Sequence, residues 1–348
     1  MVKGKKQLLS QILWKTGIDR VLRQWCDPRL MVFNFHRIRP DSADFCSEFD
    51  DEVFGPTVSE FRRQMIWLKK NTRILTEKQL LDVVQGRREL EGVSTLITFD
   101  DGYADNYSLA WPVLRDLGVP AIFFIPTQSI TDRGLGWWDL IAYFLKKTTL
   151  REISLRGARF DLSKQEDAKR ALLDILKLEP ASGNTGLIEE LARACGVQMP
   201  SRETCSKELM TWDQVQELAE QGLTIGSHSH SSDVLSTLTL AQQKEQLEFS
   251  KIELEKRIQR PVRTVAYPVG GYEHFNLETK ALARDCGYEA GFSFTHEVNS
   301  LENLRKDPFC IRRLVPDLDL SITVGVVSCP SLFVKKRSQA DASVLAAS

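Results

Sequence analysis

Two adjacent carboxylates, Asp100 and Asp101, directly follow an apolar and β-branched run at 94–99 and precede Gly102. The run predicts a buried strand of a parallel sheet, and a turn at Gly102 can direct both carboxylates toward one cleft. Adjacent carboxylates repel, so a chain keeps such a pair mainly where a cation or a proton transfer uses it. The alternative is a turn in which Asp101 caps a helix that begins near 104.

Other polar groups also follow predicted strands. His36 comes after the apolar run 30–35, His228 after 223–226, and Pro268 after 263–267. The carboxyl ends of parallel strands converge at one face of an α/β barrel, where active sites lie. Four such segments on separate strands therefore indicate a catalytic site more strongly than any one of them.

The elements behind these residues alternate between strand and helix patterns, which predicts a parallel α/β architecture. A block at about 149–205 interrupts the alternation. It contains a predicted hairpin at 153–162 and helical stretches at 164–178 and 185–195. We interpret this block as a helical insertion in the barrel or sheet.

Composition limits the classes of function. The chain has 348 residues and a net charge of −1, which gives no reason to expect a nucleic-acid partner. No run of apolar residues is long enough to span a membrane. Seven scattered cysteines without a CxxC argue against a disulfide framework or a structural zinc site. Together with a basic N-terminus that lacks the apolar core of a signal peptide, they lead us to expect a cytoplasmic protein.

The two ends of the chain are predicted to lie outside the main domain. Residues 1–28 contain a basic amphipathic helix at 7–25, which would dock on the protein or make peripheral contact with a membrane surface. Residues 326–348 end in small residues and are expected to be a disordered tail.

Several segments resemble the polysaccharide deacetylase family, that is, the NodB-homology domain or carbohydrate esterase family four. TFDDG at 98–102, the segment 210–228 that ends in TIGSH, and VAYPVGGY at 265–272 are similar to its three motifs. A subgroup found among exopolysaccharide-synthesis proteins has segments similar to four others: MVFNFHRIRPD at 31–41, SEFRRQMIWLKK at 59–70, WWD at 137–139 and DPFCIRRL at 307–314. The resemblance implies a distorted (β/α) barrel of the NodB-homology type over 29–325, with fewer than eight regular units.

The resemblance also implies a hydrolase that removes N-acetyl groups from an N-acetylhexosamine-containing glycan or its precursor. By the family pattern Asp100 is the general base, and a divalent metal, with zinc the first candidate, is held by Asp101 and His228. Arg313 matches an arginine of the subgroup that orients the base. A salt bridge at the rim of the sheet is the alternative for Arg313.

The sequence departs from the family pattern at the second histidine ligand. Ser232 stands four residues after His228, where the family has histidine, and His230 lies only two residues on. If 228–230 is extended, His230 can be a third metal ligand; if the segment turns, it points away. The departure raises a rival hypothesis, a non-catalytic glycan-binding or assembly protein on the same fold.

The remaining candidates would bind substrate. The third motif has Ala266 and Val269 in place of an arginine and an aromatic residue, but a backbone N–H can still stabilise an oxyanion. The predicted substrate-binding residues are His36, Tyr267, Pro268, Gly270 and Trp138. Structural roles are the alternatives for His36 and Trp138, the latter as core packing at the start of a helix.

Overall fold

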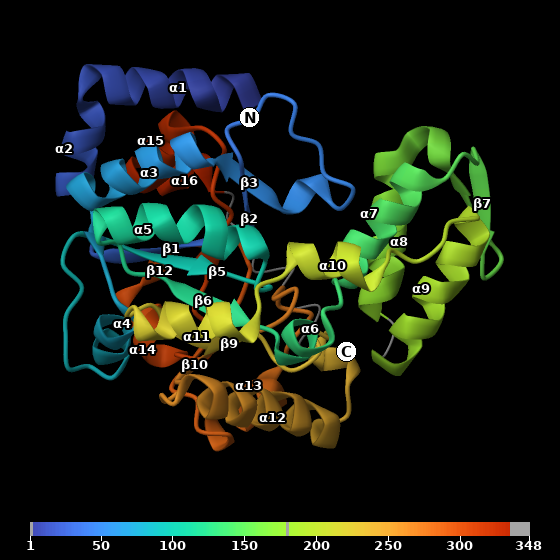
Figure 1. Cartoon of the computed structure of the whole chain (residues 1–348). Coiled ribbons are helices and arrows are strands. Elements are labelled where there is room, and N and C mark those ends of the chain that lie inside the picture. The colour runs from blue at the N-terminus through green and yellow to red at the C-terminus, as the bar shows by residue number, and fades with distance from the viewer. Residues whose placement is uncertain (1–2, 179–180, 335–348) are drawn as a thin grey trace.

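The computed structural model describes residues 3–178 and 181–334, and its centre is one curled, mostly parallel sheet (Figure 1). The strand order is β11, β10, β9, β6, β5, β1, β12, with β4 paired to β5 and β13 paired to β1. Only β12 is antiparallel to its neighbour in this sheet. The strands are β1 (Arg29–Phe35), β4 (Arg73–Ile74), β5 (Val93–Phe99), β6 (Ile122–Ile125), β9 (Thr224–Ser227), β10 (Thr264–Ala266), β11 (Ala290–Phe292), β12 (Asn299–Ser300) and β13 (Arg313–Leu314).

The segment before β13 joins the two ends of this sheet. Ile311 forms a parallel bridge with Phe292 of β11, and its N–H donates to the carbonyl of Gly291 at 2.8 Å. Two residues later, Arg313 pairs with Val32 of β1. The sheet therefore curls into a distorted barrel, and the predicted fold class is confirmed.

The strands are apolar because both faces of the sheet are covered. Every residue of β5 is buried, and the barrel interior is filled by side chains such as Leu96, Phe124 and Phe292. Helices pack on the outer face, and several begin at a Thr or Asn that accepts a hydrogen bond from the third helical residue. The helices between the strands are α3 (Val58–Asn71), α4 (Glu77–Val84), α5 (Trp111–Leu117), α6 (Thr127–Asp132), α10 (Arg202–Glu208), α11 (Trp212–Glu220), α12 (Leu240–Ile258), α13 (Leu277–Asp285) and α14 (Leu301–Lys306).

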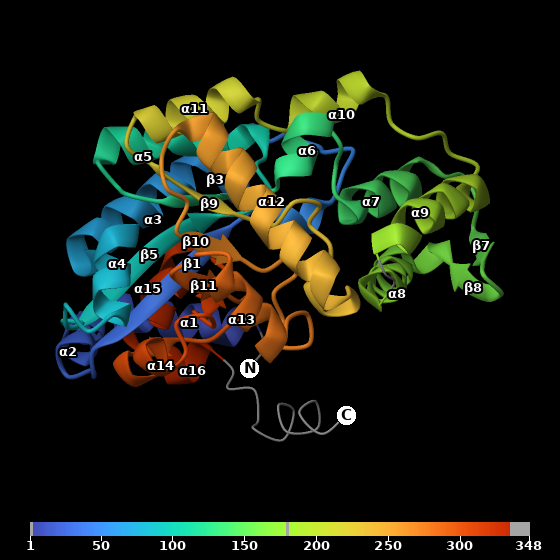
Figure 2. The ribbon, with the colours of Figure 1, turned by 90° about the horizontal axis from the view of Figure 1, so that it is seen from below.

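A second group of elements lies to one side of the barrel (Figures 1 and 2). It has its own apolar core, formed by residues such as Ile141, Leu172 and Leu191. It consists of α7 (Trp137–Lys147), the hairpin β7 (Glu152–Leu155) and β8 (Ala158–Asp161), α8 (Gln165–Leu178) and α9 (Ala181–Cys195). The insertion proposed from the sequence begins at 149, whereas this group of elements begins with α7 at 137.

The two ends of the described chain pack against each other. Leu13 of α1 (Lys3–Thr16) and Leu22 of α2 (Ile18–Gln24) join a cluster with Ile322 of α15 (Leu320–Ser328) and Phe333 of α16 (Pro330–Phe333). The expectation of a disordered tail from 326 is therefore wrong for 326–334, where α15 ends, α16 forms, and Phe333 and Val334 are buried. The rest of that tail, 335–348, lies outside the described residues. Among the described helices, none has the length and apolar character needed to cross a membrane.

Candidate active site

A cavity of about 350 Å³ opens at the carboxyl ends of β1, β5, β9 and β10. It brings together most of the site residues predicted from the sequence. Those that line it are His36, Asp100, Asp101, Trp138, His228, Pro268 and Arg313. Trp137, Val269, Phe294, and Leu173 and Lys177 of α8 are also part of its lining.

Asp100 is buried and fixed on both sides of its carboxylate. Arg313 Nη1 donates to Oδ1 at 2.7 Å, and Asn34 Nδ2 donates to Oδ2 at 3.0 Å. Arg313 also donates to Asn34 Oδ1 at 2.8 Å, so the three side chains form one network. Burial alone would raise the pKa of Asp100, but the charges of Arg313, His228 and His36 lower it to about 2. Asp100 is thus an oriented carboxylate that is ionised at any working pH.

Asp101 and His228 face each other. His228 Nδ1 lies 2.9 Å from the carbonyl oxygen of Ala266 and donates its proton there, which leaves the lone pair of Nε2 facing Asp101. Nε2 lies 3.4 Å from Asp101 Oδ1. Burial lowers the pKa of His228, and burial next to Asp100 raises the pKa of Asp101 well above its usual value. Two buried acceptors that face each other in this way need a proton or a cation between them.

This pair fits part of a metal site. Two ligands of a tetrahedral zinc are about 3.3–3.5 Å apart, given the usual zinc–nitrogen and zinc–oxygen lengths. The separation of Asp101 and His228 matches that edge, and the carbonyl of Ala266 orients the ring as an outer partner orients a metal-bound histidine. No group of three or more His, Cys, Asp or Glu positioned for a metal is found in the described part of the chain. Within the described residues the geometry thus offers a pair of candidate ligands, Asp101 and His228.

The third predicted ligand, His230, does not join them. Ser229 has a left-handed φ of 60°, which turns the chain after β9. His230 Nδ1 then lies 2.7 Å from the hydroxyl of Thr127, and its ring packs on Phe249 with centroids 4.5 Å apart. The prediction that His230 ligates the metal is corrected by this geometry, since its side chain is held by α6 and α12.

Two of the predicted substrate-binding residues, Tyr267 and Gly270, make hydrogen bonds within the protein and lie outside the cavity lining. Tyr267 is fully buried, and its hydroxyl donates to the carbonyl of Phe309 at 3.1 Å. The N–H of Gly270 donates to the carbonyl of Pro268 at 2.6 Å. Neither Tyr267 nor Gly270 lines the cavity. Val269 does, with φ 60°, and its N–H has no hydrogen-bond acceptor within the described residues. Between the backbone N–H groups of Val269 and Gly270, that of Val269 is therefore the one available to an oxyanion.

His36 and Trp138, both predicted to bind substrate, line the cavity. Burial lowers the pKa of His36 to about 4, so its ring is neutral at pH 7. The ring meets Phe294 edge-on, with centroids 5.6 Å apart. A neutral imidazole in the wall of the cavity can exchange hydrogen bonds with a sugar hydroxyl or an amide.

Trp138 is the end of a buried chain of hydrogen bonds that sequence reasoning missed. Its Nε1 donates to the hydroxyl of Tyr103 at 2.8 Å, and that hydroxyl donates to Asp139 at 2.7 Å. Asp139 also accepts from the N–H of Asp50 at 3.1 Å, and the carboxylate of Asp50 accepts from Lys169 of α8 at 2.8 Å. Through this chain the insertion is fixed against the rim of the cavity.

This chain gives a prediction for Asp139→Asn. Burial raises the pKa of Asp139 from 3.8 to about 6, so the carboxyl favours the folded state most below pH 4 and progressively less as the pH rises to 6. This difference between the two pKa values corresponds to roughly 3 kcal/mol of folding free energy. In urea unfolding, the stability of wild type relative to Asp139→Asn should fall by about that amount between pH 4 and pH 7. Parallel pH curves for the two proteins would exclude a raised pKa.

Comparison with known proteins identifies the family. The family model for polysaccharide deacetylase matches residues 87–291, which include Asp100, Asp101 and His228. The chain belongs to the polysaccharide deacetylase family. The resemblance noted from the motifs is thereby confirmed.

The relatives that match this polysaccharide deacetylase share little of its sequence. The protein is 24% identical over 233 residues to YxkH of Bacillus subtilis (strain 168), which is named as a provisional polysaccharide deacetylase, with 67% of this chain and 56% of that protein covered. It is 27% identical over 136 residues to the poly-beta-1,6-N-acetyl-D-glucosamine N-deacetylase of Staphylococcus aureus (strain MSSA476), with 36% and 44% covered. The chain thus spans about half the length of the curated relatives it matches.

Solved structures agree with the fold. The deacetylase PplD of Streptococcus pyogenes, solved with acetate, aligns with a TM-score of 0.57 at 14% identity, over 87% of this chain and 99% of that one. IcaB from Ammonifex degensii aligns with a TM-score of 0.54 at 18% identity, over 87% and 98%. At these identities the likeness shows a shared fold.

Proposed function

We propose that the protein is a metal-dependent hydrolase that removes N-acetyl groups from a glycan containing N-acetylhexosamine, or from the precursor of such a glycan. The observation that carries the proposal is the arrangement of three groups in one cavity. Ionised Asp100 is held by Arg313, and beside it the acceptor atoms of Asp101 and His228 lie 3.4 Å apart. Family membership and relatives named for N-acetylglucosamine polymers support the substrate class.

The reaction adds water to an amide carbonyl and breaks the carbon–nitrogen bond, giving acetate and a free amine. Asp100 accepts the proton of the attacking water. Once protonated, the same carboxyl can return that proton to the leaving nitrogen. Arg313 and Asn34 keep the carboxylate in one orientation throughout. The open N–H of Val269 can donate to the oxyanion that forms on the carbonyl oxygen.

Asp101 and His228 would hold the metal. When bound there, a divalent cation supplies a Lewis acid that acidifies water and polarises a carbonyl oxygen. An acidified water gives up its proton more easily to the carboxylate of Asp100. With Ser232 in place of the expected histidine, the protein provides fewer ligands than the family pattern, and zinc is the metal we propose because imidazole and carboxylate suit it.

The second candidate function is a glycan-binding or assembly protein that has kept the fold without turnover. The observation that favours it is the incomplete ligand set, since His230 is turned toward Thr127. Measuring acetate release and glycan binding distinguishes the two functions. Acetate released from N-acetylated oligosaccharides in the presence of zinc supports the hydrolase, and saturable glycan binding without acetate supports the rival.

The ligand assignment is tested by comparing two histidine variants. We expect His228→Ala to weaken zinc binding at least about tenfold, since loss of even an outer partner of a metal ligand has an effect of that size. His230→Ala, two residues away, should leave the affinity unchanged because its ring is held by Thr127. Calorimetric titration of zinc into both variants and wild type measures this. Equal losses in the two variants, or a loss only in His230→Ala, would refute the assignment of His228.

A further inference from the structure

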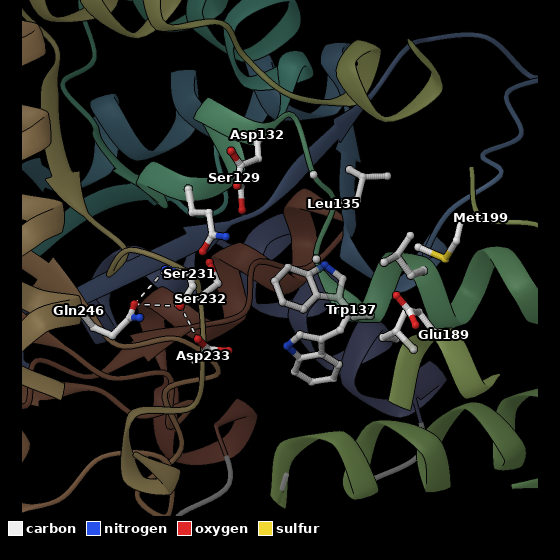
Figure 3. Close-up of a pocket in the computed structure, with 16 residues that line it drawn as sticks. Ser129, Asp132, Leu135, Trp137, Glu189, Met199, Ser231, Ser232, Asp233 and Gln246 are labelled. Atoms are coloured by element: carbon white, nitrogen blue, oxygen red, sulfur yellow. Dashed lines mark hydrogen bonds between the residues drawn. The ribbon is translucent and has the colours of Figure 1, made fainter. Parts of the chain in front are cut away.

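A second cavity, of about 530 Å³, lies next to the catalytic one. Trp137 and Trp138 line both cavities, so the two cavities adjoin at these residues. Figure 3 shows the second cavity with Trp137 on one side and Ser231, Ser232 and Asp233 on the other. Residues of α6, α7, α9 and the segment after β9 contribute to its lining, so the insertion and the barrel build it together.

The ionisable residues that line this second cavity are all acidic. Its lining includes the carboxylates Asp132, Glu189 and Asp233, and none of its described lining residues is Lys, Arg or His. Asp132 has no ion pair among the described residues, Asp233 accepts a hydrogen bond from the hydroxyl of Ser231, and the nearest cation of Glu189 is Arg193 at 3.9 Å. The catalytic cavity, by contrast, is lined by the cations Arg313 and Lys177 as well as by the carboxylates Asp50, Glu52, Asp100 and Asp101.

Two residues that line the second cavity each have a polar atom with no hydrogen-bond partner in the described part of the chain. Ser232 is 4% exposed, and its hydroxyl oxygen is buried without a hydrogen bond. The Nε1 of Trp137, across the cavity in Figure 3, is likewise buried without an acceptor. Buried polar groups are normally paired, so a donor and a hydroxyl left unpaired around one cavity point to an occupant that carries hydroxyl groups.

We propose that the second cavity binds a hexosamine unit with a free ammonium group, joined to the acetylated unit that lies in the catalytic cavity. The tryptophans offer flat apolar faces to the C–H surface of a sugar ring and attract a nearby cation. Asp132, Glu189 and Asp233 offer charge to the ammonium, and Ser232 and Trp137 offer hydrogen bonds to hydroxyls. This inference rests on the proposed function for the choice of a glycan, and it adds that the preferred substrate is already partly deacetylated.

A consequence concerns the order of events on a polymer. Each turnover replaces an acetamido group by an amine, which is charged at neutral pH. A unit deacetylated in the catalytic cavity is therefore a better occupant of the second cavity than it was before the reaction. Chains that already carry free amines should be bound more tightly and processed faster than fully acetylated chains.

The test measures binding of a fully deacetylated β-linked hexosamine tetrasaccharide, which has no acetyl group left to release. Calorimetric titration into wild type at pH 6 should show binding that weakens as salt is added. Asp132→Asn/Asp233→Asn should weaken it at least about tenfold, and Glu189→Gln should weaken it by a smaller factor. Glu190→Gln, which changes the neighbouring residue outside the lining, is the matched control and should bind as wild type does. Unchanged affinity in Asp132→Asn/Asp233→Asn, or no binding to wild type, overturns the inference.

Asp132 is exposed at the end of α6, so the single variant Asp132→Asn keeps the test informative if the double variant does not fold. Acetate release from an acetylated tetrasaccharide, measured separately, distinguishes this inference from the proposed function. Turnover with no effect of Asp132→Asn on binding removes the second site and leaves the hydrolase. Binding through Asp132 without acetate release from any glycan removes the hydrolase and leaves the second site.

Discussion

Asp100→Asn is expected to lower acetate release by about 10²- to 10⁴-fold, the usual contribution of a general base, while zinc affinity stays unchanged. Asn keeps the shape of the side chain and a carbonyl oxygen that can accept from Arg313, but it cannot take a proton from water. Asp101 and His228, which are proposed to hold the metal, are left in place. The measurements are acetate release at saturating substrate and calorimetric titration of zinc into the same preparation.

The control for this variant is Asp105→Asn. Asp105 is also buried and also paired with an arginine, since its Oδ2 lies 2.7 Å from Nε of Arg37, but it does not line the catalytic cavity. Both substitutions remove one partner of a buried ion pair, so both should lower the melting temperature. Only Asp100→Asn should remove activity from the protein that remains folded. Equal residual activity in the two variants would contradict the assignment of Asp100 as the base.

The centre of the site could be predicted from the sequence because strand ends are local features. An apolar run followed by Asp100 and Asp101, and another followed by His228, place these groups at the carboxyl edge of a parallel sheet whatever the details of packing. Asn34 was missed, although the signal was present: it is a polar residue inside the otherwise apolar run 30–35. Its side chain contacts Thr98, Asp100 and Arg313, and nothing in the local sequence indicates these partners.

The position of His230 and the way the insertion meets the cavity depend on backbone turns and on contacts between distant segments. The sequence left open whether 228–230 stays extended, and the left-handed φ of Ser229 decides that His230 turns away. A left-handed φ at a serine has no reliable sequence signal, because only glycine adopts it readily. The pairing of Asp50 with Lys169 joins residues 119 positions apart, so the way the insertion meets the cavity could not be read from periodicity.

Arg313→Met is expected to lower the free energy of unfolding by about 3–5 kcal/mol, because it leaves a buried carboxylate without its cation. The guanidinium is 1% exposed and donates to Asp100, to Asn34 and to the carbonyl of Ser293. Arg313→Lys keeps the charge but not the planar fork that reaches all three acceptors, so its loss should be smaller. Urea unfolding of wild type and both variants measures the difference.

The double variant Asp100→Asn/Arg313→Met separates the ion pair from the rest of the network. If the main cost of Arg313→Met is an unpaired charge on Asp100, neutralising that charge should restore part of the stability. The double variant should then be more stable than the sum of the single losses predicts, by about 0.5–3 kcal/mol. Additive losses would mean that Arg313 acts mainly through Asn34 and the carbonyl of Ser293. In that case the main contribution of the arginine to stability is to hold β1 to the residue that follows β11, and its contact with Asp100 adds little.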